Sequence, residues 1–256
     1  MRIAGPPDIA VDVAGTGPLL IFLHGVGGNR HNWSDQVAHF SARFTAVAWD
    51  ARGYGDSDDA PDREFTDFAD DLARVIRHFG GPAHLVGLSM GGRIALDCWR
   101  RYPLLVASLT LADTSAGAPP DADRIAAFLA LRRKPLLEEG KTPADIAPGI
   151  VASIAGPAIS PEAHARLIDS HATLRAHSYL DTLAAVTRFA DFPAFATINV
   201  PTLVIVGEHD RIAAVELARV MAAAIPGAQL EIIPGAGHVS NIEAPAAFNA
   251  ALDRFF

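Results

Sequence analysis

Six short apolar segments recur along the chain, and longer stretches of mixed polarity separate them. Continuous apolar runs of this length are typical of parallel strands that are covered on both faces of a sheet. We therefore predict strands at 18–25, 44–50, 84–89, 107–113, 201–210 and 228–238.

Between these segments, apolar residues recur at the spacing of one helical face. The spacing predicts helices at 30–40, 66–79, 90–101, 213–224 and 246–255. Because strands and helices alternate, the pattern predicts an α/β fold. Its mostly parallel sheet is expected to carry helices on both faces, joined to the strands by right-handed crossovers.

The segment 114–190 breaks this alternation, because it predicts helices but no strand. The helical patterns lie at 121–134, 142–156, 160–176 and 177–190. We interpret a helical insertion between two parallel strands as a cap over the carboxyl ends of the strands. The expected division is a core of residues 1–113 and 191–256 and a helical cap of residues 114–190.

Charge and cysteine content narrow the function classes. The chain has 21 Lys and Arg against 29 Asp and Glu, a net charge of −8, which argues against partners such as nucleic acid or an anionic membrane. The single cysteine, Cys98, excludes an internal disulfide. The N-terminal residues lack the apolar core of a signal peptide, so we expect a cytoplasmic protein. The oligomeric state stays open.

One serine is enclosed by glycines between a predicted strand and a predicted helix. Gly87-Leu88-Ser89-Met90-Gly91 fits G-x-S-x-G, the turn that presents a nucleophile at the end of a strand. Such a turn is so sharp that side chains two residues before and after the serine would collide, which explains the glycines. Ser89 is therefore the predicted nucleophile.

A serine hydroxyl needs a base to remove its proton, and the base needs an acid to orient it. His238 lies on a Gly-rich loop after the last predicted strand, and Asp210 follows the strand before it. The order Ser89, Asp210, His238 is that of α/β-hydrolase triads. Asp113, at the end of the strand that follows the Ser89 helix, is the alternative acid.

An oxyanion formed at the reacting carbonyl requires two N–H donors. The residue after the nucleophile, Met90, is expected to supply one donor. The glycines of "HGVGGN" (24–29) allow the backbone to turn inward after the first predicted strand. We therefore expect the second donor from Val26.

Several segments together resemble the α/β-hydrolase superfamily over essentially the whole chain. They are His24-Gly25-Val26, "DARGYGDSD" (50–58), "GLSMGG" (87–92), "GEHD" (207–210) and "GAGHVSNIEAP" (235–245). Within the superfamily, the third and the last are similar to the 3-oxoadipate enol-lactonase branch and to related carboxylesterases. The resemblance implies a small-molecule ester or lactone substrate, an acyl-enzyme intermediate, and neither a metal nor an organic cofactor.

Three alternatives stay open beside a general serine esterase or lactonase. They are a 3-oxoadipate enol-lactonase, a carbon–carbon bond hydrolase of a diketone with the same triad, and a non-enzymatic ligand receptor on the same fold.

Pocket residues are less well defined by the sequence. His24 and Trp33 are candidates, although His24 better fits a structural hydrogen bond and Trp33 fits helix packing equally well. We expect most arginines of the cap to be solvated, with one available to bind a substrate carboxylate bidentately. These arginines are Arg132, Arg133, Arg175 and Arg188.

Overall fold

The computed structural model describes residues 1–60, 62–115, 122–189 and 191–256, and it contains one eight-stranded sheet. The strand order is β1-β2-β4-β3-β5-β6-β7-β8, and all neighbours from β4 to β8 run parallel. The predicted α/β class with a mostly parallel sheet is confirmed. The strands are β1 (Arg2–Ile3), β2 (Ile9–Ala14), β3 (Leu19–Leu23), β4 (Thr45–Trp49), β5 (Ala83–Leu88), β6 (Val106–Ala112), β7 (Thr202–Gly207) and β8 (Gln229–Ile233).

Two strands were not predicted. β1 and β2 precede the first apolar run, and both pairs they form, β1 with β2 and β2 with β4, are antiparallel. β2 lies near the edge of the sheet, where Asp12 is half-buried and Val13 is 39% exposed. Its sequence therefore mixes polar and apolar residues, which hides it from a search for continuous apolar runs.

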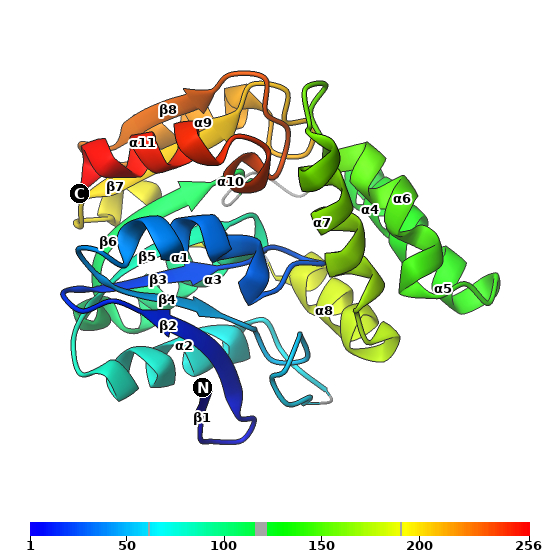
Figure 1. Cartoon of the computed structure of the whole chain (residues 1–256), viewed down its shortest axis with the longest axis horizontal. Coiled ribbons are helices and arrows are strands. Elements are labelled where there is room, and N and C mark those ends of the chain that lie inside the picture. Colours follow the sequence, from blue (N-terminus) through cyan, green and yellow to red (C-terminus); the bar gives the residue numbers. More distant parts are fainter. Residues whose placement is uncertain (61, 116–121, 190) are drawn as a thin grey trace.

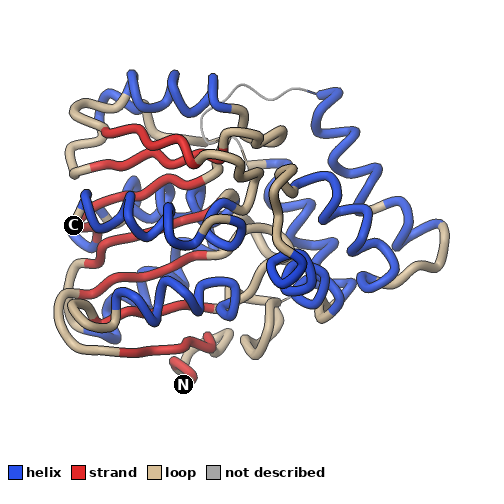
Figure 2. The backbone as a smooth tube through the Cα atoms, turned by 45° about the horizontal axis from the view of Figure 1, so that its top comes forward, coloured by secondary structure: helices blue, strands red, loops and turns tan. Residues whose placement is uncertain are grey.

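Helices cover both faces of the sheet (Figure 2). All five helices predicted in the core are present, although the one predicted at 30–40 begins with a 3₁₀ turn at Arg30–Trp33. Further 3₁₀ turns occur at Pro103–Leu105 and Phe195–Thr197. The core helices are α1 (Ser34–Phe40), α2 (Thr66–Phe79), α3 (Met90–Arg101), α9 (Val215–Ala224), the short α10 (Ser240–Glu243) and α11 (Pro245–Phe255).

Successive residues of a strand belong in turn to two apolar clusters, one on each face of the sheet. In β3, Ile21 and Leu23 pack with side chains of α2, α3 and α9, whereas Leu20 and Phe22 pack with side chains of α1 and α11. This division follows the alternation of side chains along a strand. Because both faces are buried, the strands read as continuous apolar runs, and their carboxyl ends are fixed at one edge of the sheet.

The remaining helices gather beyond that edge (Figure 1). They are α4 (Ala122–Arg132), α5 (Lys134–Glu138), α6 (Pro143–Ile154), α7 (Pro161–Ala172) and α8 (Ala176–Arg188). As predicted, described residues 122–189 contain no strand. Thr142 and Ser160 cap the N-termini of α6 and α7 with their hydroxyls. Residues 116–121 and 190 of the expected cap lie outside the described residues.

Burial of β3 predicts a large stability difference between two leucines. Leu20 is 0% exposed, so Leu20→Ala should lower the free energy of unfolding by about 2–5 kcal/mol. The same change at Leu104, which is 91% exposed, should alter it by less than about 0.5 kcal/mol. Urea unfolding of both variants measures the difference, and equal losses would contradict the position of β3 between two apolar layers.

Candidate active site

Ser89 occupies a strained turn between β5 and α3. Its backbone has φ 54° and ψ −112°, values that cost a non-glycine residue free energy. Two hydrogen bonds hold the turn: Ser89 N–H donates to the Ala112 carbonyl (2.8 Å), and the Thr114 hydroxyl donates to the Ser89 carbonyl (2.9 Å). The side chain therefore stands clear at the carboxyl edge of the sheet.

The two flanking glycines make this turn possible. A Cβ atom at Gly87 would collide with the carbonyl of Gly91, and one at Gly91 would collide with the carbonyl of Leu23 in the neighbouring strand. The backbones of β3, β5 and α3 can therefore approach one another only without side chains at these positions. The predicted reason for both glycines agrees with this geometry.

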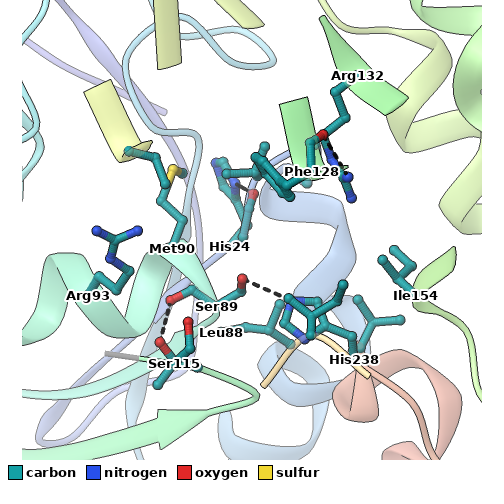
Figure 3. A pocket seen from close by; sticks show the side chains of 18 of the residues that line it. His24, Leu88, Ser89, Met90, Arg93, Ser115, Phe128, Arg132, Ile154 and His238 are labelled. Atoms are coloured by element: carbon teal, nitrogen blue, oxygen red, sulfur yellow. Dashed lines mark hydrogen bonds between the residues drawn. The ribbon is translucent and has the colours of Figure 1, made fainter. Parts of the chain in front are cut away.

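Ser89, His238 and Asp210 form a continuous hydrogen-bonded series. Nε2 of His238 lies 2.9 Å from Oγ of Ser89 (Figure 3), and Nδ1 of His238 lies 2.8 Å from Oδ2 of Asp210. The other carboxylate oxygen of Asp210 accepts hydrogen bonds from the N–H groups of Ile212 (2.7 Å) and Ala213 (2.8 Å). Asp210 is thus fixed on the side away from the imidazole.

Within this series, the buried side chains of His238 and Asp210 each stabilise the charged form of the other. Burial favours neutral His238, but the charge and hydrogen bond of Asp210 outweigh it and raise the His238 pKa above 6.5. Burial likewise opposes ionised Asp210, but His238 and the two backbone N–H groups lower the Asp210 pKa below 3.8. An ionised carboxylate therefore faces an imidazole that readily takes up a proton.

Asp113 lies near this pair without contacting the imidazole. Its Oδ1 accepts from Gly207 N–H (2.8 Å), and its Oδ2 accepts from both the N–H (2.9 Å) and the hydroxyl (2.6 Å) of Ser240. Burial, together with the charge of Asp210, raises the pKa of Asp113 to about 7. The structure therefore brings Asp210, and not Asp113, into hydrogen-bond contact with His238.

The two expected oxyanion donors lie beside Ser89. Met90 is the first residue of α3, and Val26 follows β3; both residues line the cavity above Ser89. Within the described part of the chain, neither N–H has a hydrogen-bond acceptor. Gly25 permits the close approach, because a Cβ there would come within 3.1 Å of the Ser89 Cβ.

His24 and Trp33 border the cavity from buried positions. The Ala51 N–H donates to His24 Nε2 (3.1 Å), so the proton of neutral His24 resides on Nδ1, which lies 2.8 Å from the Gly25 carbonyl. Burial lowers the His24 pKa, which keeps the ring neutral. Trp33 is 0% exposed and stacks on Phe22 with ring centroids 5.1 Å apart. His24 therefore supports the loop that follows β3, and Trp33 packs in the core.

Sequence reasoning missed Glu243, which holds the His238 loop. Its carboxylate accepts from the N–H groups of Gly237 (3.1 Å), Val239 (3.3 Å) and Gly156 (2.7 Å). Gly156 follows α6, so one carboxylate joins the end of α6 to the loop. The His238 N–H strengthens this junction by donating to the Ile154 carbonyl (2.8 Å). The only local signal is the position of Glu243 in "NIEAP".

A cavity of about 520 Å³ lies between the sheet edge and the helices α4, α6, α7 and α8, with Ser89 and His238 on its wall. Of the four cap arginines considered above, Arg132 and Arg188 border it. Arg133 is exposed, and Arg175 donates to the carbonyls of Gly55 and Ser57. Arg132 departs from the expectation of a solvated side chain, since it is only 5% exposed.

Comparison with known proteins identifies the family. The profile of the alpha/beta hydrolase family matches residues 20–251, which is most of the chain. The chain belongs to this family.

Similar proteins within the alpha/beta hydrolase family include several hydrolases. 2-(Acetamidomethylene)succinate hydrolase of Mesorhizobium japonicum is 29% identical over 248 residues, covering 94% of this chain and 88% of the relative. 3-Oxoadipate enol-lactonase 2 of Acinetobacter baylyi is 28% identical over 255 residues, covering 96% and 92%. The structure of a thermophilic esterase from Thermogutta terrifontis matches with a TM-score of 0.90 at 26% identity, covering 100% of this chain and 97% of the esterase.

The described residues contain neither a membrane-spanning helix nor a cluster of metal-ligating side chains. None of their helices has the length and apolar character needed to cross a membrane. Their His, Cys, Asp and Glu side chains form no group of three or more that could hold a metal ion.

The three hydrogen bonds that Glu243 accepts from backbone N–H groups, here called the Glu243 clamp, give a prediction that does not depend on the substrate. Glu243→Gln replaces one acceptor oxygen by an NH₂ group, which faces a backbone N–H. We expect amide hydrogen exchange at Gly156, Gly237 and Val239 to accelerate about tenfold, as the loss of a charged hydrogen bond implies. Glu231→Gln, which breaks a surface ion pair with Arg254, is the matched control. Unchanged protection at all three amides would show that the clamp does not hold the loop.

Proposed function

We propose that this protein is a serine hydrolase that cleaves a carboxylic ester or lactone of a small molecule through an acyl-enzyme intermediate. The observation that carries the proposal is the series Asp210–His238–Ser89, with contacts of 2.8 and 2.9 Å, on the wall of a cavity. The names of the similar proteins, which denote hydrolases or an esterase, support it.

Acylation begins when Oγ of Ser89 attacks the substrate carbonyl carbon while its proton passes to Nε2 of His238. The N–H groups of Val26 and Met90 hold the resulting oxyanion, a contribution typically worth about a hundredfold or more in rate for each donor. When the bond from carbon to the leaving oxygen breaks, His238 returns the proton to that oxygen. The acyl group is then joined to Ser89 as an ester.

Deacylation repeats these steps with water. Water adds to the acyl carbon as its proton passes to His238, and the bond from carbon to Ser89 Oγ then breaks as the proton returns to Oγ. Throughout, Asp210 orients His238 and stabilises its charged form. No step requires a metal or an organic cofactor.

The helices α4 to α8 serve in this proposal as a cap over the reacting groups. The proposed division into a core of 1–113 and 191–256 and a cap of 114–190 is supported by the position of these helices between β6 and β7. The cavity volume of about 520 Å³ suits a small molecule. The cap therefore limits the size of the acyl group.

Removing the nucleophile tests the proposal directly. Ser89→Ala should lower turnover by at least about a thousandfold, because only positioning and the oxyanion donors remain. Ser153→Ala, in α6 and away from the cavity lining, is the matched control and should keep wild-type turnover. The assay is a panel of short to long p-nitrophenyl esters, enol-lactones and diketones. Equal turnover by wild type and Ser89→Ala on every substrate would contradict the proposal.

The raised pKa of His238 predicts the pH profile. His238 must be neutral to accept a proton, so kcat/KM should fall as the pH decreases through its pKa, which lies above 6.5. Asp210→Asn removes the charge that raises this pKa, so the acid limb should move to lower pH. The same variant should lose roughly a thousandfold or more in kcat.

Asp113→Asn is the control for the identity of the acid. Asp113 acts on the His238 pKa through charge alone, so this variant should shift the acid limb less than Asp210→Asn does. It should also keep at least about tenfold more of the kcat, since the Asp210 contact survives. Equal losses in the two variants would contradict the assignment of Asp210.

A further inference from the structure

The charged side chains around the cavity are all of one sign. Five arginines border it, and among the described lining residues there is no Asp or Glu. This is unexpected in a chain with 29 acidic and 21 basic residues. The lining arginines are Arg93, Arg124, Arg132, Arg188 and Arg211.

Arg132 stands apart within this set because it is the only one of the five whose side chain is buried. It is 5% exposed, and no carboxylate of the described residues lies within ion-pair distance. Its guanidinium stacks 4.0 Å from the centre of the Phe128 ring, makes a long contact, 3.4 Å, with the Phe128 carbonyl, and lies beside the neutral hydroxyl of Tyr179. In Figure 3 it projects toward the space above Ser89 and His238.

Known structural roles do not account for burying this charge. Arg132 is the last residue of α4, where the helix dipole favours a cation, but that effect is a small fraction of the cost of removing a guanidinium from water. Stacking on one phenylalanine adds a similarly small amount. Burial correspondingly lowers the Arg132 pKa, and nearby Tyr179 only partly opposes this. A carboxylate on a bound ligand would compensate this charge, because guanidinium and carboxylate groups form strong, bidentate hydrogen bonds.

Two other basic groups of the cavity, His171 and Arg93, are less suited than Arg132 to bind an anion. Burial lowers the pKa of His171 to about 4, so its imidazole stays neutral. Arg93 is half-buried, but it donates to the Phe189 carbonyl (2.7 Å) and lies against the rings of Phe65 and Phe192. Figure 3 places Arg93 on the opposite side of Ser89 from Arg132. Arg132 is thus the group best placed to bind the charged end of a ligand.

We infer that the substrate carries a carboxylate, which pairs with Arg132 while its ester or lactone carbonyl lies at Ser89. The inference rests on the proposed function, since it assigns a substrate class to the same site. It requires the carboxylate and the scissile carbonyl to be parts of one molecule, because Arg132 and Ser89 border one cavity.

Matched substrates separate this anion site from general esterase activity. Mono-4-nitrophenyl adipate and 4-nitrophenyl hexanoate place the carboxylate or a methyl group at the end of the acyl chain. 4-Carboxyphenyl and 4-carbamoylphenyl hexanoate place a carboxylate or a neutral amide on the leaving group. We expect wild type to prefer the anionic member of at least one pair by about tenfold or more in kcat/KM.

Three variants test whether Arg132 causes the preference. Arg132→Met should lower the ratio of anionic to neutral kcat/KM by about ten- to a hundredfold. Arg132→Lys should lower it less, because it keeps the charge but loses the bidentate fork. Arg133→Met is the matched control, since Arg133 is the exposed neighbour and does not border the cavity. This control should leave the ratio unchanged.

A binding measurement keeps the inference separate from catalysis. Hexanoate should raise the melting temperature of Ser89→Ala, hexanamide should not, and the additional change Arg132→Met should abolish the shift. An anion effect that depends on Arg132 supports the inference even if no ester is cleaved, an outcome that would overturn only the proposed function. Ester cleavage without any dependence on Arg132, in either the substrate ratio or the melting shift, would overturn the inference and leave the hydrolase intact.

Discussion

The backbone of Ser89 is the constraint on which the site depends. Its φ of 54° places the hydroxyl clear of the sheet edge, at a typical cost of about 1–3 kcal/mol for such a conformation. The cost is tolerated because Gly87 and Gly91 let β3, β5 and α3 come into backbone contact. Because the strands are buried on both faces, packing fixes the backbone on either side of the turn. Ser89 is therefore held in its strained conformation by the surrounding sheet.

His238 is fixed by contacts from both parts of the molecule. Asp210, at the end of β7, holds its side chain, whereas the Ile154 carbonyl, at the end of α6, holds its backbone. Glu243 then joins the same loop to Gly156. The helices above the sheet therefore bear on the position of the imidazole as well as on the shape of the cavity. A displacement of α6 relative to the sheet would therefore strain the hydrogen bond to the His238 backbone.

Local patterns predicted the parts of the site that local geometry determines. β3 to β8 read as apolar runs because both faces are buried, and Ser89 was recognised from glycines that its own turn requires. Asp113 and Asp210 follow strands in the same way, and only the tertiary structure shows which faces the imidazole. Glu243 has no such signature, because the Gly156 amide that it binds lies 87 residues away. The apolar pattern did not predict β2, because a strand near the edge of the sheet is partly exposed and its sequence is not continuously apolar.

Net charge and cavity charge carry different information, and Arg132 shows why. A formal charge of −8 argues against extended polyanionic partners, whose binding depends on many exposed cations. Surface carboxylates, however, are screened by salt over a Debye length of about 8 Å, whereas a guanidinium in a low-dielectric cavity is not. The potential at a ligand inside the cavity is therefore set by the few charges on its wall. Composition argues against nucleic acid as a partner, but the inferred preference for a small anion rests on the fold, which buries Arg132 without a carboxylate of the described residues within ion-pair distance.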